Sequence, residues 1–207
     1  MSSTAVILAD GNFPFHEIPL GYLKGAEHII CCDGSAKELV KAGLEPEAIV
    51  GDLDSLDNEL TVRYSDRLFK DSDQETNDLT KAVKWCVARG LKEIIIVGAT
   101  GKREDHTIGN ISLLAEYSSE VNVIMVTDTG TIKPFRNSSR ISSFPGQKVS
   151  VFSINPETEI TSAGLRYKLN KLKLHNWWMA TLNEATGESF TLTFTGGPVI
   201  VYQKFSD

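Results

Sequence analysis

Two aspartates one residue apart, Asp52 and Asp54 in the stretch GDLDSL, are the clearest candidates for chemistry in this sequence. They follow a short apolar run, and an extended chain would project both side chains to the same side. Neighbouring carboxylates repel one another unless a proton or a cation lies between them, and a hard divalent ion such as Mg²⁺ is the simplest bridge. The pair therefore predicts a magnesium site. The alternative is that Asp54 and Ser55 only cap a following helix, with Asp52 as the sole ligand.

Other aspartates also follow apolar runs. Asp33 comes after HIICC, Asp71 and Asp73 come after RLFK, and Asp105 comes shortly after EIIIVGA. The carboxyl ends of parallel strands lie along one edge of a sheet, and ligands bind in the crevice there. Each aspartate alone is explained as a turn former. Together they predict a cluster that binds a divalent cation and, through it, a polyphosphate.

The stretch DSDQETNDLTKAV contains the start of an expected helix. Asn77 lies four residues and Asp78 three residues before Lys81, so all three share one face of that helix. Free N–H groups at a helix start attract anions, and a lysine one turn later can reach a phosphate. The stretch predicts a phosphate-and-metal corner. The alternative is a capped surface helix with an Asp–Lys pair.

The stretch GATGKREDHTIGN has glycines that allow the backbone to approach a ligand. Its spacing is not that of a Walker A loop. Lys102 and Arg103 bring positive charge, and the guanidinium of Arg103 is suited to phosphate oxygens. Asp105 precedes an expected helix that carries His106 and Asn110. His106 could act as a base, but support of the loop through its ring nitrogens is the favoured interpretation.

The elements that must position these residues change in character along the chain. Up to about Asp128, β-branched runs alternate with helical patterns, which is typical of an α/β, Rossmann-like domain with a parallel sheet. The expected strands are 5–9, 28–32, 48–51, 93–99 and 121–126, and the expected helices are 35–42, 78–89 and 107–117. Short alternating runs, GLRYKL among them, then predict a small all-β sandwich, and Trp177 and Trp178 are expected on one of its strands. The predicted domains are 1–130 and 131–207.

Composition excludes several classes of protein. With 207 residues and 41% hydrophobic content the chain can form a substantial core, and no apolar run approaches the length of a membrane span. A net charge of −6 without a basic run argues against nucleic-acid binding. The three cysteines form no disulfide framework and are expected to be reduced core residues. Because no secretory signal pattern is visible at the N-terminus, we expect a cytoplasmic protein.

The motifs DGSA, GDLDS, DQETNDLTKA and GATGKREDHTIGN, in this order, resemble those of the thiamine pyrophosphokinase family. The resemblance covers most of the chain, including GLRYKL at Gly164. It implies transfer of the diphosphate of ATP to the hydroxyl of thiamine, giving thiamine diphosphate and AMP. It also implies a homodimer in which an α/β domain binds ATP and Mg²⁺, while the β-sandwich completes the thiamine pocket across the subunit interface.

The resemblance assigns roles to particular residues. The implied metal ligands are Asp52, Asp54, Asp73, Asp78 and Asp105, and the implied catalytic group is Asp52, Asp54, Asp78, Asp105 and Arg103. The implied ATP or thiamine contacts are Asp33, Gln74, Asn77, Lys81, Arg103, His106, Trp178 and Asn183. Either Trp177 or Trp178 could stack on the thiazolium ring, and the alternative is that both only pack. Ser35, Asn77 and Leu182 depart from the family pattern.

Other functions remain open at this level. The same residues suit a diphosphokinase for another alcohol, such as a pterin, and Leu182 in place of an expected hydroxyl favours keeping that alternative. A metal-dependent nucleotidyl or sugar-nucleotide transferase also uses a D-x-D pair, but it would not account for the DQETND and REDH stretches. A non-catalytic nucleotide-sensing module would bind ATP without consuming it.

Overall fold

The structure is a computed structural model that describes residues 3–206. The chain forms two compact units. The first runs to Leu113 and includes Glu120–Asp128, and the second comprises Leu114–Ser119 and the chain from Thr129 onward. Among the described residues, no helix is both long and apolar enough to cross a membrane. The three cysteines are free and buried, as the sequence predicts.

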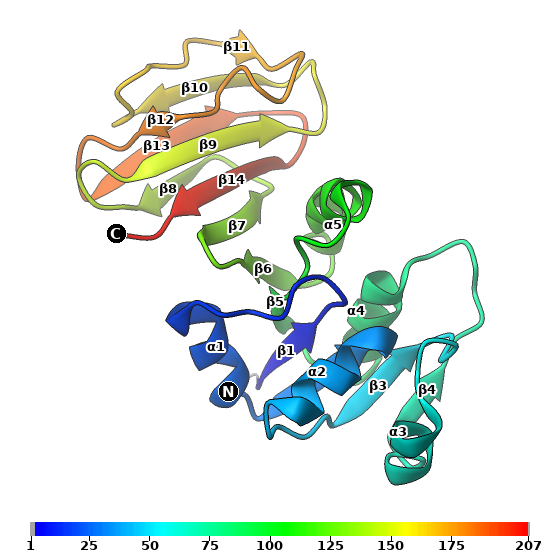
Figure 1. Ribbon diagram of the computed structural model, residues 1–207. Helices are drawn as coiled ribbons and strands as arrows, with labels where there is room; N and C mark the ends of the chain where they lie inside the picture. The colour runs from blue at the N-terminus through cyan, green and yellow to red at the C-terminus, as the bar shows by residue number, and fades with distance from the viewer. Residues whose placement is uncertain (1–2, 207) are drawn as a thin grey trace. The chain divides into compact units, whose positions relative to one another are not determined.

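Six strands of the first unit run parallel in the order β6-β5-β1-β2-β3-β4 (Figure 1). They are β1 (Thr4–Leu8), β2 (His28–Cys32), β3 (Ala48–Gly51), β4 (Leu68–Lys70), β5 (Glu93–Val97) and β6 (Asn122–Val126). Their mostly buried β-branched runs confirm the predicted α/β class. The chain builds outward from β1 to β4 and then returns to β5 on the other side of β1. This reversal opens a crevice at the carboxyl ends of β1 and β5.

Helices connect these strands. The helices described are α1 (Glu17–Lys24), α2 (Ala36–Lys41), α3 (Asn58–Arg63), α4 (Asp78–Ala88) and α5 (Glu104–Tyr117), with a short 3₁₀ turn, η1 (Asp33–Ser35), before α2. Helix α4 packs on β1, β2 and β3. Apolar spacing predicts α2, α4 and α5 but misses α1 and α3. Helix α3 has only six residues, and α1 contains a proline and a glycine and is capped by the ring of His16.

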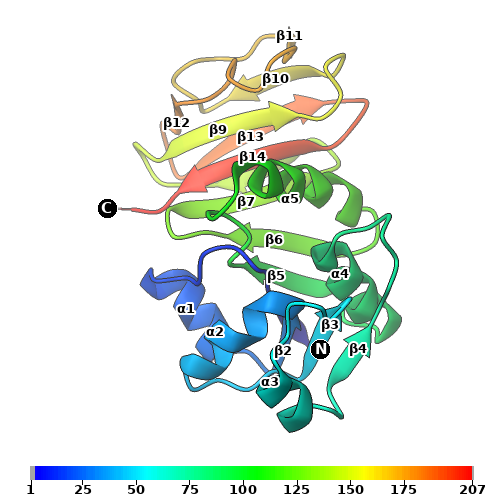
Figure 2. The same ribbon diagram turned by 45° about the vertical axis from the view of Figure 1, so that its right-hand side comes forward.

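The second unit is built from short antiparallel strands. They are β7 (Gly130–Phe135), β8 (Ser139–Ser142), β9 (Lys148–Ser153), β10 (Glu159–Ala163), β11 (Leu172–Lys173), β12 (Asn183–Glu184), β13 (Ser189–Phe194) and β14 (Val199–Lys204). They pair in two sets, β12-β9-β14-β7 and β11-β10-β13-β8 (Figure 2). Alternate side chains of both sets, such as Val151 and Leu192, share one core. The antiparallel pairing predicted here is confirmed.

Two local expectations in the second unit are wrong. The GLRYKL stretch is not a strand but an irregular loop with one bridge, from Leu165 to Ala185. Its backbone is held by other means: the N–H of Arg166 donates to the carbonyl oxygen of Glu184 at 2.8 Å. Trp177 and Trp178 lie in a turn rather than on a strand. Trp177 packs against Phe152, with 5.8 Å between ring centroids.

Candidate active site

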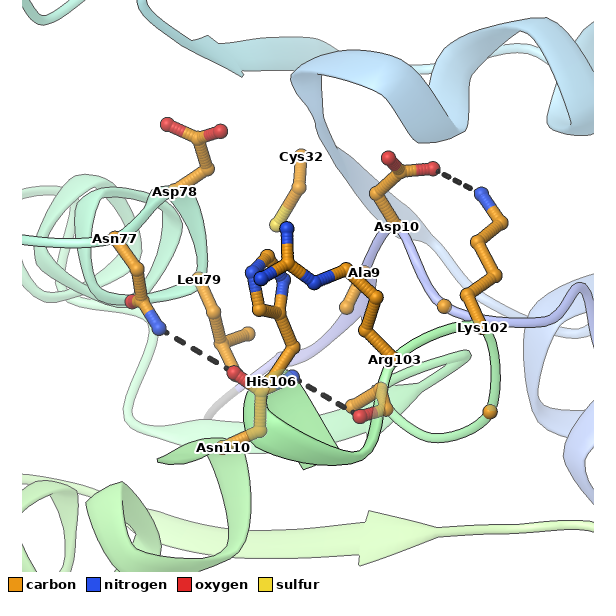
Figure 3. A pocket seen from close by; sticks show the side chains of 13 residues that line it. Ala9, Asp10, Cys32, Asn77, Asp78, Leu79, Lys102, Arg103, His106 and Asn110 are labelled. Carbon is orange, nitrogen blue, oxygen red and sulfur yellow. Dashed lines mark hydrogen bonds and ion pairs between the residues drawn. The ribbon is translucent and has the colours of Figure 1, made fainter. Parts of the chain in front are cut away.

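The crevice between β1 and β5 contains a pocket of about 230 Å³ (Figure 3). Its walls come from the segments after β1, β2 and β5 and from the first turns of α4 and α5. A pocket of this size is smaller than most small-molecule sites and matches part of a phosphate chain better than a whole nucleotide. The polar side chains that line it are Asp10, Asn77, Asp78, Lys102, Arg103, His106 and Asn110.

The loops after β1 and β5 are joined by their backbones. The N–H of Gly11 donates to the carbonyl oxygen of Gly98 at 2.6 Å, and that of Asn12 donates to Thr100 at 2.8 Å. A Cβ at Gly11 would lie only 2.4 Å from the carbonyl oxygen of Thr100, an overlap with backbone that no side-chain movement relieves. Glycine at this position therefore brings the two loops together along one side of the pocket.

Three carboxylates converge beside the wall of the pocket that contains Asp78. One oxygen from each of Asp33, Asp52 and Asp54 lies within 4.8 Å of the other two. Asp33 is only 2% exposed, and its Oδ2 accepts a hydrogen bond from the N–H of Ser55 at 3.2 Å. Its Oδ1 is buried and has no hydrogen-bond partner in the described part of the chain. An unpartnered buried carboxylate oxygen is costly unless a cation binds it, and an all-oxygen donor set fits Mg²⁺.

The pKa values within this cluster shift in opposite directions. Burial raises the pKa of Asp33, the hydrogen bond from Ser55 opposes this, and the charge of Asp78 adds to the rise. The pKa of Asp52 is lowered, first by the N–H of Asp54 and also by hydrogen bonding to Gln74, which places Gln74 beside the cluster. A divalent cation would favour the charged form of each carboxyl.

The convergence of Asp52 and Asp54 has a different cause from the one expected. The residue between them, Leu53, has φ +65°, so the chain is kinked there rather than extended. The kink brings the N–H of Asp54 to 3.3 Å from Oδ1 of Asp52. A left-handed conformation costs a leucine roughly 1 kcal/mol, and such strain is typical of functional sites.

The start of α4 supplies the adjoining wall of the pocket. Asn77 is the N-cap, and its Oδ1 accepts from the N–H of Thr80 at 2.9 Å. Asp78 lines the pocket and pairs with the buried ammonium of Lys81 at 3.1 Å. Burial opposes the charge of Lys81, but Asp78 outweighs it and the pKa of Lys81 is raised. A Cβ on Gly51 would lie 2.8 Å from Cβ of Asp33 and 3.3 Å from Cγ and Oδ1 of Asp78. Glycine at this position therefore leaves room for both side chains.

The loop between β5 and α5 supplies the basic side. Arg103 and His106 line the pocket, and Nδ2 of Asn110 donates to the carbonyl oxygen of Ala99 at 3.0 Å. The side chain of Asn77 also reaches Oδ1 of Asn110, at 3.3 Å (Figure 3). Arg103 makes two bonds to Asp105, one of them from Nε at 3.0 Å. This pairing lowers the pKa of Asp105 to about 2.

Some predicted site residues are not brought to the acidic cluster. Asp73 accepts from the N–H of Glu75 and the hydroxyl of Thr76, so its carboxylate serves its own loop. Asp105 lies with Arg103 and is outside the three-carboxylate group. Their metal-binding roles stay predictions, as do the assignments of the other site residues.

The two candidates in the second unit differ in exposure. Trp178 is 73% exposed. Asn183 is buried, and its amide makes hydrogen bonds with the backbone of Tyr167 at 2.7 and 3.1 Å. Asn183 therefore holds a loop that carries an exposed tyrosine, while Trp178 is available to a ligand or a partner.

Sequence reasoning missed Asp10, which lines the pocket after β1 and pairs with Lys102. The signal was present, because an aspartate-glycine pair follows the first predicted strand. Ser35, which departs from the family pattern, also has a clear role. Its hydroxyl lies 2.7 Å from the carbonyl oxygen of Leu8 and 2.6 Å from that of Cys32, so it links the ends of β1 and β2.

Comparison with known proteins agrees with these features. Residues 20–126 match the model of the thiamin pyrophosphokinase catalytic domain, and residues 130–202 match that of the thiamin pyrophosphokinase substrate-binding domain. Thiamine pyrophosphokinase of Bacillus subtilis is 28% identical over 221 residues, covering 97% of this chain and 98% of that protein. Thiamin pyrophosphokinase 1 of Caenorhabditis elegans is 26% identical over 180 residues, covering 78% of this chain and 72% of that protein.

Solved structures show the same fold. A thiamin pyrophosphokinase family protein from Enterococcus faecalis superposes with a TM-score of 0.82 at 21% identity, covering 99% of this chain and 100% of that one. Thiamin pyrophosphokinase from Candida albicans has a TM-score of 0.82 at 18% identity, covering 98% and 90%. Together with the two family models, which span both units, these matches confirm the resemblance in the motifs. The chain belongs to the thiamin pyrophosphokinase family.

Proposed function

We propose that the crevice between β1 and β5 binds ATP with Mg²⁺, and that the protein transfers the diphosphate of ATP to the hydroxyl of thiamine. This transfer, which gives thiamine diphosphate, is the reaction of the family. The observation that carries the assignment to this crevice is the buried Oδ1 of Asp33, which lies beside Asp52 and Asp54 and has no hydrogen-bond partner among residues 3–206. A cation-binding group next to a pocket lined with basic side chains suits a metal-bound polyphosphate.

The reaction requires attack of the alcohol at the β-phosphorus, in line with the bond to the α-phosphate. The main obstacle is charge that develops on the phosphate oxygens, so electrostatic stabilisation matters more than covalent catalysis. Mg²⁺, when held by Asp33, Asp52 and Asp54, would supply part of that stabilisation. Arg103 would supply more, because its two bonds to Asp105 leave other guanidinium N–H groups to donate to phosphate.

We propose that Asp78, rather than Asp105, is the base that accepts the proton of the alcohol. Asp78 lines the pocket, and its Oδ1 lies 3.1 Å from Nζ of the buried Lys81, which leaves its other carboxylate oxygen for the alcohol. Asp105 accepts from Arg103 through both oxygens, and a pKa of about 2 makes it a poor base. Lys81 thus acts on the phosphate site mainly through Asp78, while Asn77 and His106 shape the wall of the pocket.

We assign thiamine binding and homodimer formation to residues 131–207. Five large apolar side chains described in this part are exposed, and the three most exposed are Tyr167 at 62%, Trp178 at 73% and Leu182 at 81%. Exposed apolar groups mark surfaces that bind ligands or partners. An indole ring can stack on the cationic thiazolium of thiamine, which favours Trp178 for that contact.

Incubation of the purified protein with ATP, Mg²⁺ and a panel of alcohols tests the proposal. We expect AMP and thiamine diphosphate, with thiamine preferred over pterin alcohols. Formation of thiamine monophosphate with ADP, or of no product, would contradict it. A second readout is independent of turnover: Mg²⁺ should raise the Tm of the protein, and the Asp52→Asn variant should lose that response.

A further inference from the structure

The side chain of Lys102 crosses from the loop after β5 to the loop after β1. Its Nζ lies 2.7 Å from Oδ1 of Asp10, and both residues line the pocket (Figure 3). The other oxygen of Asp10 packs against Gly34, where an added Cβ would lie only 2.7 Å from it. Both side chains are about half exposed, at 49% and 50%. The cation is thus held at the open side of the pocket rather than buried within it.

The backbone at Lys102 is strained. Its φ is +52°, a value that favours glycine, and the N–H of Arg103 donates across it to the carbonyl oxygen of Gly101 at 2.6 Å. A three-residue turn with a positive φ at its centre is a rare and strained form. The loop uses glycine at its other left-handed positions, Gly98 and Gly101. A lysine at the third such position is therefore unfavourable for the backbone.

The ion pair does not account for this cost. A half-exposed pair between flexible side chains adds little net stability, because solvent screens it and the side chains lose freedom. Strain that local contacts do not offset points to a functional requirement. The other cations of the pocket region already have fixed partners: Lys81 is buried against Asp78, and Arg103 is bound twice by Asp105. Lys102 is half exposed and held by a single ion pair, so it can exchange its anion more readily than the buried Lys81 or the doubly bound Arg103.

We propose that Lys102 is a phosphate-binding residue of this pocket, with Asp10 holding its ammonium group until a triphosphate replaces the carboxylate. The proposal rests on the proposed function, since the triphosphate is that of ATP. The ammonium exchanges one oxygen anion for another, so it is paired in both states, while the half-exposed carboxylate of Asp10 is left to solvent. Arg103 and Lys102 then contact the phosphate chain from neighbouring positions of one turn.

The Lys102→Gly variant separates the effect of the strained backbone at this residue from the effect of its charged side chain. Removal of the side chain relieves the left-handed backbone, so Tm should rise. Loss of one charged hydrogen bond should raise KM for ATP about tenfold, with kcat and KM for thiamine changed less than about twofold. Lys102→Asn, which tolerates a positive φ but has no charge, should show the same rise in KM.

Lys171→Gly is the matched control. Lys171 also has a positive φ, of +49°, and it belongs to the second unit and is not among the residues that line the pocket. Its replacement should raise Tm in the same way and leave KM for ATP unchanged. An active wild-type protein whose KM for ATP is the same in the Lys102→Gly variant would overturn the proposal.

Asp10→Asn tests the role of the carboxylate. It should lower KM for ATP about threefold when Lys102 is present and by less when residue 102 is glycine, because the two residues are coupled. An equal effect in both backgrounds would show that Asp10 only repels the nucleotide. Calorimetric binding of inorganic tripolyphosphate with Mg²⁺ separates this inference from the function: equal affinities of wild type and Lys102→Gly overturn it even if no thiamine diphosphate forms.

Discussion

The segments after β2 and β3 gather carboxylates with few partners, whereas the loop after β5 pairs its two cations with carboxylates. Oδ1 of Asp33 has no partner among the described residues, while Arg103 is bound by Asp105 and Lys102 by Asp10. An unpaired anion raises the free energy of the protein until a cation binds, whereas a paired cation is held in place and can exchange its anion. This contrast is what we expect if the segments after β2 and β3 bind the metal and the loop after β5 binds the phosphate chain.

The largest expected effect comes from removing one charge on the carboxylate side. Asp54→Asn should lower kcat by about 100-fold or more, because it removes a ligand of the catalytic cation. Tm in EDTA should change little, since Asp54 is exposed. Steady-state kinetics and thermal melts measure both. Near-normal turnover in this variant would remove Asp54 from the metal site.

A neighbouring aspartate provides the control for that experiment. Asp57 caps α3 by accepting from the N–H of Leu60 at 2.9 Å, and it is not one of the three clustered carboxylates. Asparagine caps a helix about as well as aspartate does. Asp57→Asn should therefore leave both activity and Tm close to those of the wild type.

An intermediate effect is expected from neutralising Asp33. Without metal, the buried charge destabilises the fold, so Asp33→Asn should raise Tm in EDTA at neutral pH. The folded state raises the pKa of Asp33 above its ordinary value of 3.8, so it binds this proton more tightly than the unfolded chain does. The stabilising effect of protonation is present at low pH and is lost as pH rises through the raised pKa.

The sign of that shift predicts how the difference depends on pH. The Tm gap between Asp33→Asn and wild type in EDTA should be widest at neutral pH and should shrink on acidification, where Asp33 is protonated. Saturating Mg²⁺ should reverse the order, because only the wild type gains stability from the cation. A gap that is constant from neutral pH to pH 4 would show that Asp33 carries no such shift.

The smallest effect is expected from Leu53, the residue between Asp52 and Asp54. Leu53→Asn keeps the kink but relieves strain, so it should raise the free energy of unfolding by about 1 kcal/mol or less. For a protein of this size that corresponds to a rise in Tm of about 2–4 °C. Leu53→Val disfavours the same conformation further and should weaken the Mg²⁺ response of Tm. A fall in Tm for Leu53→Asn would contradict the strain at this position.

The first unit was largely predictable because its signals are local and strong. Buried β-branched runs mark β1, β2, β3, β5 and β6, and an aspartate soon after such a run indicates the edge where ligands bind. Residue spacing alone did not predict the left-handed backbone at Leu53, since leucine rarely adopts it. It also did not separate Asp73, whose oxygens cap its own loop, from the aspartates that converge.

The second unit was harder to predict in detail. Alternation correctly indicates antiparallel pairing. GLRYKL has the composition of a strand, but it is held as a loop by the side chain of Asn183 and the backbone of Glu184. The turn at Trp177 and Trp178 likewise depends on packing against Phe152. Such contacts join residues far apart in the sequence, so no local pattern records them.

Gly51 packs against the side chains of Asp33 and Asp78, and a Cβ at this position would lie 2.8 Å from Cβ of Asp33 and 3.3 Å from the carboxyl group of Asp78. Because residue 51 has no side chain, Asp33 and Asp78 can lie close together, and this would set the distance between an ion at Asp33 and the groups around Asp78. If the proposed ion and phosphate chain bind here, a glycine without functional groups of its own would set their spacing.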